Sequence, residues 1–421
     1  IARAMFPPWA ALVAVLIGEG VVYHGFTSPE FNVNVASLPF WALAIALSHR
    51  LYSADTNERL TVFWACLGLV VAGAFLAKYT AALLGICLLI LMLTPAAWHW
   101  WRKPGPYIAV GVGALVGLPH ALWLIANGFP TFAYALGRGA GDETQLMDHV
   151  AAPLQFLASQ APAIAVGIVL AALAWPWRPR WPRFGNRQDL FLLVIGVGPI
   201  AVLMIISAVF AFELKAMWGT TLFTTLGLMV VAWGGPSCHG VALRRCVGGV
   251  VITLMIGAVI YLAEPTASAR LLERGKRVQF PGPELARITE AHWERRFGEP
   301  LPMVVGDEWL GGTIAHYAEA RPPVFLNANS KEAPWASMDA LLRDGGIVVW
   351  MSDKRGSTAI PISESTLADL VERAPALEEQ PPLELPWATS APLRPVVIGW
   401  AMIPPQEVAT PVEKDGDSLV K

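Results

Sequence analysis

The sequence TVFWACLGLVVAGAFLAKYTAALLGICLLILMLTPAA, at residues 61–97, decides the fold. It is strongly apolar, and it is too long for one membrane span, which needs roughly 17 to 25 residues. Lys78 is its only charged residue, and a charged side chain is costly at the centre of a bilayer. We therefore predict two spans here, joined by a tight hairpin at Lys78 and Tyr79.

Other apolar stretches of similar length flank this pair, so the sequence predicts about nine spans. They cover residues 8–23, 35–52, 61–77, 80–97, 107–126, 153–177, 190–212, 216–233 and 247–263. Of the 421 residues, 55% are hydrophobic and 15% are charged, which excludes a single soluble globule. The predicted fold class is an α-helical polytopic membrane protein.

The basic residues predict how these spans are oriented. Alternate loops carry eleven basic residues against three, and loops rich in Lys and Arg stay in the cytoplasm. The richer set is Arg3, Arg50, Arg59, Arg102, Lys103, Arg178, Arg180, Arg183, Arg187, Arg244 and Arg245, and the other set is Lys78, Arg138 and Lys215. We therefore expect an integral, multi-pass protein of the inner (plasma) membrane with an extracytoplasmic C-terminal part.

A step in charge density divides the chain. Residues 1–264 carry 14 basic and 10 acidic residues, whereas the shorter remainder carries 16 and 22. We predict a transmembrane region at 1–264, an extracytoplasmic α/β domain at 265–407 and a disordered tail at 408–421. In the domain, strands at 303–305, 324–326, 347–350 and 396–400 alternate with helices at 283–297, 310–319, 337–343 and 363–373.

The polar and aromatic residues of the predicted outer loops form the candidate substrate-binding site. They are Glu30, Asn32, Asn34, Lys78, Tyr79, His120, Tyr134, Arg138, Glu213, Lys215 and Trp218. An ionisable residue at membrane depth suggests a function, although Lys78 could instead extend to the headgroups. The polar residues at 30–34 could hydrogen-bond a sugar or cap the following helix. Glu213 and Lys215 could form an ion pair with each other. Trp218 could stack on a sugar or anchor the chain at the membrane interface.

The remaining composition argues against two other classes of site. Cys66 and Cys87 lie in predicted spans, and Cys238 and Cys246 lie in or beside an inner loop without the paired spacing of a metal site. We predict no metal site and no disulfide framework, and the need for a divalent metal stays open. The net charge of −2 and the dispersed basic residues predict no binding of nucleic acid.

Five motifs along the chain resemble a known family. They are SPEFNVN at 28–34, FLAKYTAALL at 75–84, LPHALWL at 118–124, FPTFAYAL at 129–136 and FELKAMWG at 212–219. In their order and spacing they are similar to the family 39 type of membrane glycosyltransferases, the group with dolichyl-phosphate-mannose protein mannosyltransferases and bacterial aminoarabinose transferases. The resemblance implies a GT-C-like fold.

The same resemblance implies transfer of a sugar from a polyprenyl-phosphate donor to a lipid, glycan or protein acceptor at the outer membrane face. Lys78 matches the family's lysine associated with the carrier phosphate. The family's acidic catalytic base belongs to an outer loop that would lie upstream of Ile1, so we expect this chain to be truncated and inactive in transfer. One alternative is a transporter, but the sequence shows no internal repeat, which transporters often have. The other is a membrane-anchored binding protein whose soluble tail is the active part, but reactive residues do not cluster in the tail.

Overall fold

The computed structural model describes residues 1–54, 60–132, 146–174, 176–235, 240–273, 275–351, 358 and 360–406. The chain forms two compact units, Ile1–Val259 and Ile260–Lys421. The first unit is built from helices, and the second contains a five-stranded sheet.

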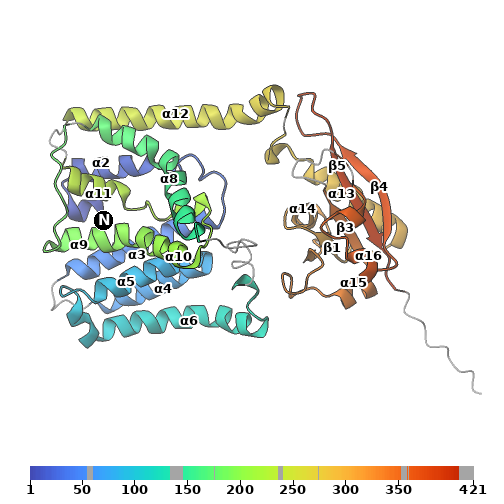
Figure 1. The fold of residues 1–421 in the computed structure, drawn as a ribbon, viewed down its shortest axis with the longest axis horizontal. Helices are drawn as coiled ribbons and strands as arrows, with labels where there is room; N and C mark the ends of the chain where they lie inside the picture. Colours follow the sequence, from blue (N-terminus) through green and yellow to red (C-terminus); the bar gives the residue numbers. More distant parts are fainter. Residues whose placement is uncertain are drawn as a thin grey trace, which may run out of the picture. The chain divides into compact units, whose positions relative to one another are not determined.

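Apolar helices build the first unit (Figure 1). In chain order they are α1 (Ala2–Met5), α2 (Pro8–Glu19), α3 (Val33–Ser53), α4 (Thr61–Ala77), α5 (Ala81–Met92), α6 (Pro104–Ala126), α8 (Asp148–Leu173), α9 (Arg187–Leu192), α10 (Gly198–Phe210), α11 (Leu226–Gly234) and the part of α12 (Gly240–Leu271) up to Val259. A π-helical turn, Leu193–Val197, joins α9 to α10. The 3₁₀ helices η1 (Trp98–Arg102) and η3 (Ala216–Gly219) lie in two of the connections.

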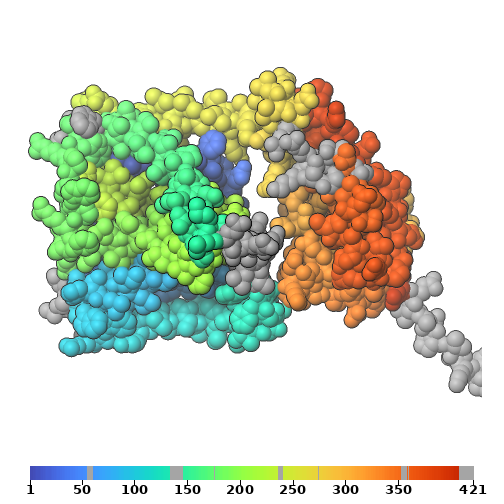
Figure 2. Space-filling view, in the orientation of Figure 1, coloured from blue at the N-terminus to red at the C-terminus, as the bar shows by residue number. Residues whose placement is uncertain are grey.

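Four helices in the described part of the chain are long and apolar enough to cross a membrane. They are Pro104–Ala126, Asp148–Leu173, Arg187–Phe210 and Gly240–Leu271, and Pro8–Glu19, Thr61–Ala77 and Ala81–Met92 are shorter apolar helices. The chain is thus a polytopic membrane protein, and the number of nine spans stays a prediction. In Figure 2, α12 (yellow) forms one edge of the unit, and its Leu254, Met255 and Ile256 are exposed, as suits a lipid-facing helix.

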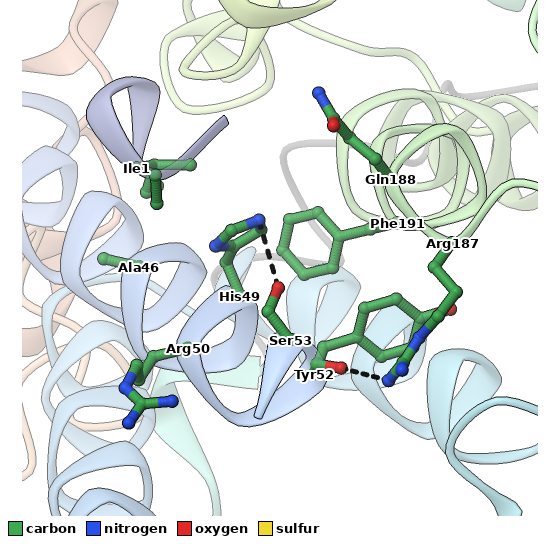
Figure 3. A pocket seen from close by; sticks show the side chains of 10 residues that line it. Ile1, Ala46, His49, Arg50, Tyr52, Ser53, Arg187, Gln188 and Phe191 are labelled. Atoms are coloured by element: carbon green, nitrogen blue, oxygen red, sulfur yellow. Dashed lines mark hydrogen bonds between the residues drawn. The ribbon is translucent and has the colours of Figure 1, made fainter. Parts of the chain in front are cut away.

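The connections between the helices gather at two ends of the unit (Figure 1). At one end, Arg187 of α9 donates a hydrogen bond to the backbone carbonyl of Tyr52 in α3 (Figure 3). At the other end, Lys78 after α4 donates to Asn34 in α3. Arg50 of α3 and Arg187 of α9, two members of the larger basic set, lie at the first of these ends. Which end faces the cytoplasm stays a prediction.

Small residues let neighbouring helices approach closely. Gly68 of α4 lies against α6, where a Cβ on Gly68 would come within 2.1 Å of the carbonyl oxygen of Ala109. A Cβ on Gly113 of α6 would lie 3.4 Å from the carbonyl oxygen of Gly68, whereas Gly117 faces open space. Helices in a membrane associate through close packing of this kind, because lipid tails are as apolar as leucine.

The predicted hairpin is confirmed, since α4 ends at Ala77 and α5 begins at Ala81. The predicted spans at 8–23 and 80–97 are too long, because α2 ends at Glu19 and α5 at Met92. The residues that follow each of them form turns.

The predicted span at 216–233 is wrong as a continuous helix. Residues 216–219 form η3, residues 220–225 form turns, and α11 begins only at Leu226. The hydroxyls of Thr220 and Thr224 donate to carbonyls three residues earlier in the chain, at 2.7 Å each. Such local bonds compete with the backbone ladder of a helix. An apolar composition therefore does not make this segment a helix.

The second unit carries a mixed sheet in the order β2-β1-β3-β5-β4. Its strands are β1 (Val304–Gly306), β2 (Val324–Leu326), β3 (Gly346–Trp350), β4 (Glu378–Leu385) and β5 (Val396–Ile403). β1 pairs in parallel with β2 and β3, while β5 pairs antiparallel with β3 and β4. The helices are α13 (Gly282–Phe297), α14 (Leu310–Tyr317), α15 (Met338–Asp344) and α16 (Leu370–Arg373).

Alternate residues of these strands point to opposite faces of the sheet. Val304 belongs to one apolar cluster with Trp293 of α13, and Val305 belongs to another with Phe325 and Leu341 of α15. The strands predicted from apolar runs are all present within a few residues. The predicted helix at 363–373 is only a 3₁₀ turn, Ile362–Glu364, followed by the short α16. The predicted tail at 408–421 lies outside the described residues.

Candidate functional site

Lys78 contacts two other predicted site residues, Asn34 and Trp218, which lie far from it along the chain. The ammonium Nζ donates a hydrogen bond of 2.5 Å to Oδ1 of Asn34. The same nitrogen lies 5.7 Å from the ring centroid of Trp218, within the range of a cation–π contact. Asn34 is buried, and Lys78 and Trp218 are partly exposed. The neighbours of this ammonium are therefore an amide oxygen and an aromatic face.

The hairpin between α4 and α5 fixes the position of Lys78. The residue caps the C-terminus of α4 in an extended conformation, and its backbone N–H bonds to the carbonyl of Ala74 at 2.9 Å. Residues 78–80 lie between the two helices, outside both spans. Burial lowers the pKa of the Lys78 ammonium to about 8, because the charged form loses hydration. A bound anion would restore the preference for the charged form.

Trp218 belongs to the short helix η3, which a buried amide holds in place. Gln160 of α8 donates from Nε2 to the carbonyl of Ala216 at 3.1 Å. Tyr23 donates its hydroxyl to the same carbonyl at 2.7 Å and lies 3.0 Å from Oε1 of Gln160. A Cβ on Gly219 would lie only 2.0 Å from that Oε1. A side chain at position 219 would therefore displace the amide of Gln160.

A second group forms around Tyr79, on the other side of the hairpin. Its hydroxyl lies 2.6 Å from Nε2 of His120 in α6 and 2.9 Å from Oγ1 of Thr131. Its ring stacks on Phe75 at 4.9 Å and on Phe132 at 5.4 Å between centroids. Tyr79 and His120, both predicted site residues, are thus direct neighbours.

The other predicted residues of the first outer loop serve the start of α3. Asn32 is the N-cap of that helix, and its Oδ1 accepts the backbone N–H of Asn34 at 2.9 Å. Its Nδ2 donates to the backbone carbonyl of Glu30, whose side chain is exposed. The capping alternative thus describes Asn32, while Asn34 faces Lys78. Glu30 takes part in this cap through its backbone carbonyl.

Glu213 and Lys215 form an ion pair with each other at 2.8 Å, and both are substantially exposed. Tyr134 and Arg138 lie outside the described residues. Within the ranges that the structure describes, no group of three or more His, Cys, Asp or Glu side chains is arranged to hold a metal ion.

Gln160, Tyr23 and Thr131 are the contacts that reasoning from sequence missed. Gln160 is a polar residue inside an apolar stretch, and that pattern is a signal for a functional or structural role. Tyr23 and Thr131 gave no such signal, because Tyr23 stands at the end of a predicted span and Thr131 stands in a largely apolar motif. Their partners became evident only from the fold.

Comparison with known proteins gives a match to a family model over the first part of the chain. Residues 1–123 match the family model of dolichyl-phosphate-mannose-protein mannosyltransferase. This region includes Asn34, Lys78, Tyr79 and His120 but not Trp218. No curated protein and no solved structure gives a significant match to the chain. The family match supports a membrane glycosyltransferase of the GT-C type.

Proposed function

We propose that this protein transfers a sugar from a polyprenyl-phosphate-linked donor to an acceptor at the outer face of the membrane. The observation that carries the proposal is the meeting of Lys78, Asn34 and Trp218 at one end of the helical unit. The family match over residues 1–123 supports the same chemistry. A lipid-linked donor also explains why the site lies at the end of membrane helices.

In this proposal Lys78 binds the phosphate of the donor. The acceptor oxygen forms a bond to the anomeric carbon, the bond from that carbon to the phosphate oxygen breaks, and a base takes the acceptor's proton. Negative charge then develops on the departing polyprenyl phosphate. A fixed ammonium stabilises this charge more strongly where water is scarce, and Asn34 keeps it in position. Trp218 offers an aromatic face to the sugar.

The first experiment measures binding of a polyprenyl-phosphate sugar to the purified protein in detergent micelles. We expect Lys78→Ala to weaken binding about tenfold to a hundredfold, the range of a lost charge-assisted contact. Lys78→Arg should retain part of the affinity, because a planar guanidinium replaces a compact ammonium. Lys103→Ala is the matched control, since that lysine lies in the connection between η1 and α6, outside the candidate site, and it should bind like the wild type. Unchanged binding by Lys78→Ala would refute the donor site.

The second experiment separates a transferase from the alternatives. The protein, expressed from its complete reading frame, is placed in vesicles with labelled donor and acceptor. Free polyprenyl phosphate and labelled product are expected from a glycosyltransferase. Intact donor that crosses the membrane without cleavage would instead indicate a transporter, and donor that is bound but neither moved nor cleaved would indicate a binding protein. The sugar and the acceptor are then identified from the product.

A further inference from the structure

The end of α12 is built into the second unit. Residues from Ile260 onward belong to that unit, so it contains the last part of a helix that is long and apolar enough to cross a membrane. The side chains of Ile260, Tyr261 and Leu262 are exposed, and Glu264 is the first charged residue after them. A charged side chain is costly inside the hydrocarbon core, so the core ends near Glu264. The second unit thus contains its own mark of the membrane boundary.

The chain returns to this boundary after α12. The helix continues for about two turns beyond Glu264, and the short 3₁₀ helix η4 (Arg277–Gln279) follows it. Lys276, just before η4, forms an ion pair with Glu264. Gln279 donates from Nε2 to the backbone carbonyl of Pro265 at 3.4 Å. η4 therefore lies within the length of one side chain of the place where the span leaves the core.

Gln279 also attaches η4 to the rest of the second unit. It is buried, and its Oε1 accepts the backbone N–H of Lys276 at 3.1 Å. Its backbone carbonyl accepts the N–H of Ala388, in the connection between β4 and β5, at 2.8 Å. A Cβ on Gly275 would come within 2.3 Å of the ring of Trp387 in the same connection. These contacts make η4 part of the domain rather than a loose linker.

The exposed side of η4 is amphipathic. Val278 is 76% exposed although it is apolar. Arg277 is exposed too, and its guanidinium carbon lies 5.0 Å from the ring centroid of Trp309. Phe280 packs against the rings of Trp309 and Trp387, at 5.7 and 6.1 Å between centroids. Tryptophan is enriched where a protein meets the headgroups of a membrane, because its ring is apolar and its N–H is polar.

The charges around η4 have both signs. Arg270 and Glu273 are exposed near the pair formed by Lys276 and Glu264. Arg274 and residues 352–357 lie outside the described residues. The inference therefore rests on the depth of η4 and on its exposed apolar side chain, and it needs no excess of positive charge.

We propose that η4 contacts the phospholipid headgroups of the leaflet in which α12 ends, through Val278 and Arg277. The headgroup layer adds about 5 to 8 Å on each side of the hydrocarbon core, which is comparable to the reach of a glutamine side chain. A bilayer is the favoured occupant of this surface, because it surrounds the span at this depth and the end of the span belongs to the same unit as η4. The contact orients the second unit on the membrane.

The test places a fluorophore on η4 and a quencher on the lipid. Val278→Cys is introduced into the protein expressed from its complete reading frame, labelled with a nitrobenzoxadiazole maleimide and reconstituted in phosphatidylcholine vesicles. Part of the lipid carries a nitroxide on its headgroup. We expect emission at a shorter wavelength than in water, and strong quenching by the nitroxide lipid. The wild type, treated with the same maleimide, gives the background from the native cysteines.

Val371→Cys is the matched control, because Val371 is another exposed valine of the second unit. Its neighbour Leu370 belongs to the apolar cluster on one face of the sheet, whereas Phe280, beside η4, packs against the cluster on the other face. Quenching should be several-fold weaker at position 371 than at position 278. Equal quenching at the two positions would overturn the proposal. Short-wavelength emission at position 278 that the nitroxide lipid does not quench would show that protein covers η4, and would overturn it as well.

A second pair of variants tests whether Gln279 holds η4 at this depth. Gln279→Ala, combined with the labelled Val278→Cys, removes the side-chain bonds to Lys276 and Pro265, so quenching should fall toward the level of the control. Gln380→Ala removes an amide that bonds within β4, and it should leave quenching at position 278 unchanged. Equal quenching in these two variants would overturn the role of Gln279.

Discussion

Among the described residues, the ammonium of Lys78 contacts an amide oxygen and an aromatic ring. Its importance could be predicted from sequence, because one lysine interrupts an otherwise apolar stretch. Its partners could not. Asn34 and Trp218 lie far away along the chain, and no periodicity within a helix relates them to the hairpin.

The pKa of Lys78 predicts how donor binding depends on pH. Its pKa of about 8 means that the ammonium is charged below this pH and neutral above it. A donor sugar phosphate is a diester whose charge is constant over this range, so we expect its affinity to be highest below about pH 8 and to fall as the pH rises through that value. Titration of binding from pH 6.5 to 9.5 measures this. Lys78→Arg should abolish the inflection near pH 8, because a guanidinium stays charged, and an inflection that persists would assign the titration to another group.

Asp189 is the other residue for which a single change should have a large effect. Its carboxylate is fully buried and is satisfied by Arg180, by the backbone N–H of Arg183 and by Trp233. We expect Asp189→Asn to lower the free energy of unfolding by about 2 to 3 kcal/mol. The expected loss in free energy of unfolding is smaller than for a fully buried ion pair, because the Arg180 side chain is 39% exposed.

Reversible unfolding in mixed micelles measures the effect of Asp189→Asn. Glu213→Gln breaks an exposed ion pair in the same unit and should change the free energy of unfolding by no more than about 0.5 kcal/mol. If the two variants were equally stable, the Asp189 contacts would contribute no more than a surface pair.

At the scale of elements, η3 depends on one close contact. Gly219→Ala would bring a Cβ against the amide of Gln160, so we expect the element to shift and donor affinity to fall about tenfold through Trp218. The double variant Gly219→Ala, Gln160→Ala should recover part of that loss, because the clashing group is gone. Gly117→Ala on α6 meets nothing within 4 Å and should bind donor like the wild type. Additive losses in the double variant would show that the two residues act independently.

The helices show which elements a sequence can predict. Apolar runs bounded by polar residues gave the hairpin at Lys78 correctly, and they located most helix ends within several residues. They failed at 216–225, where apolar character persists but threonine hydroxyls and Gly219 favour turns. They also missed β4, whose sequence EEQPPLEL contains two prolines and three acidic residues and shows no apolar run. Pairing with β5, rather than local preference, makes this segment a strand.

For the whole molecule, the basic residues predict an orientation that reporter fusions can test. Arg50 and Arg187, two members of the larger basic set, lie at one end of the helical unit, so we expect this end in the cytoplasm. An alkaline phosphatase fusion near Gly282 should then be active, and a fusion in the loop at 178–187 should be inactive. The opposite pattern would reverse the topology and would place the Lys78 site at the inner face.

The edges of the sheet in the second unit have a consequence for a protein confined to a surface. One edge strand, β2, has only three residues, and the other, β4, carries Pro381 and Pro382 where its register with β5 shifts. Short edges and prolines resist the addition of a further strand from another molecule. Chains tethered to one membrane share a thin layer and collide far more often than chains diluted in a volume. The short edge strand β2 and the prolines of β4 would let such domains lie close together without aggregating through their sheets.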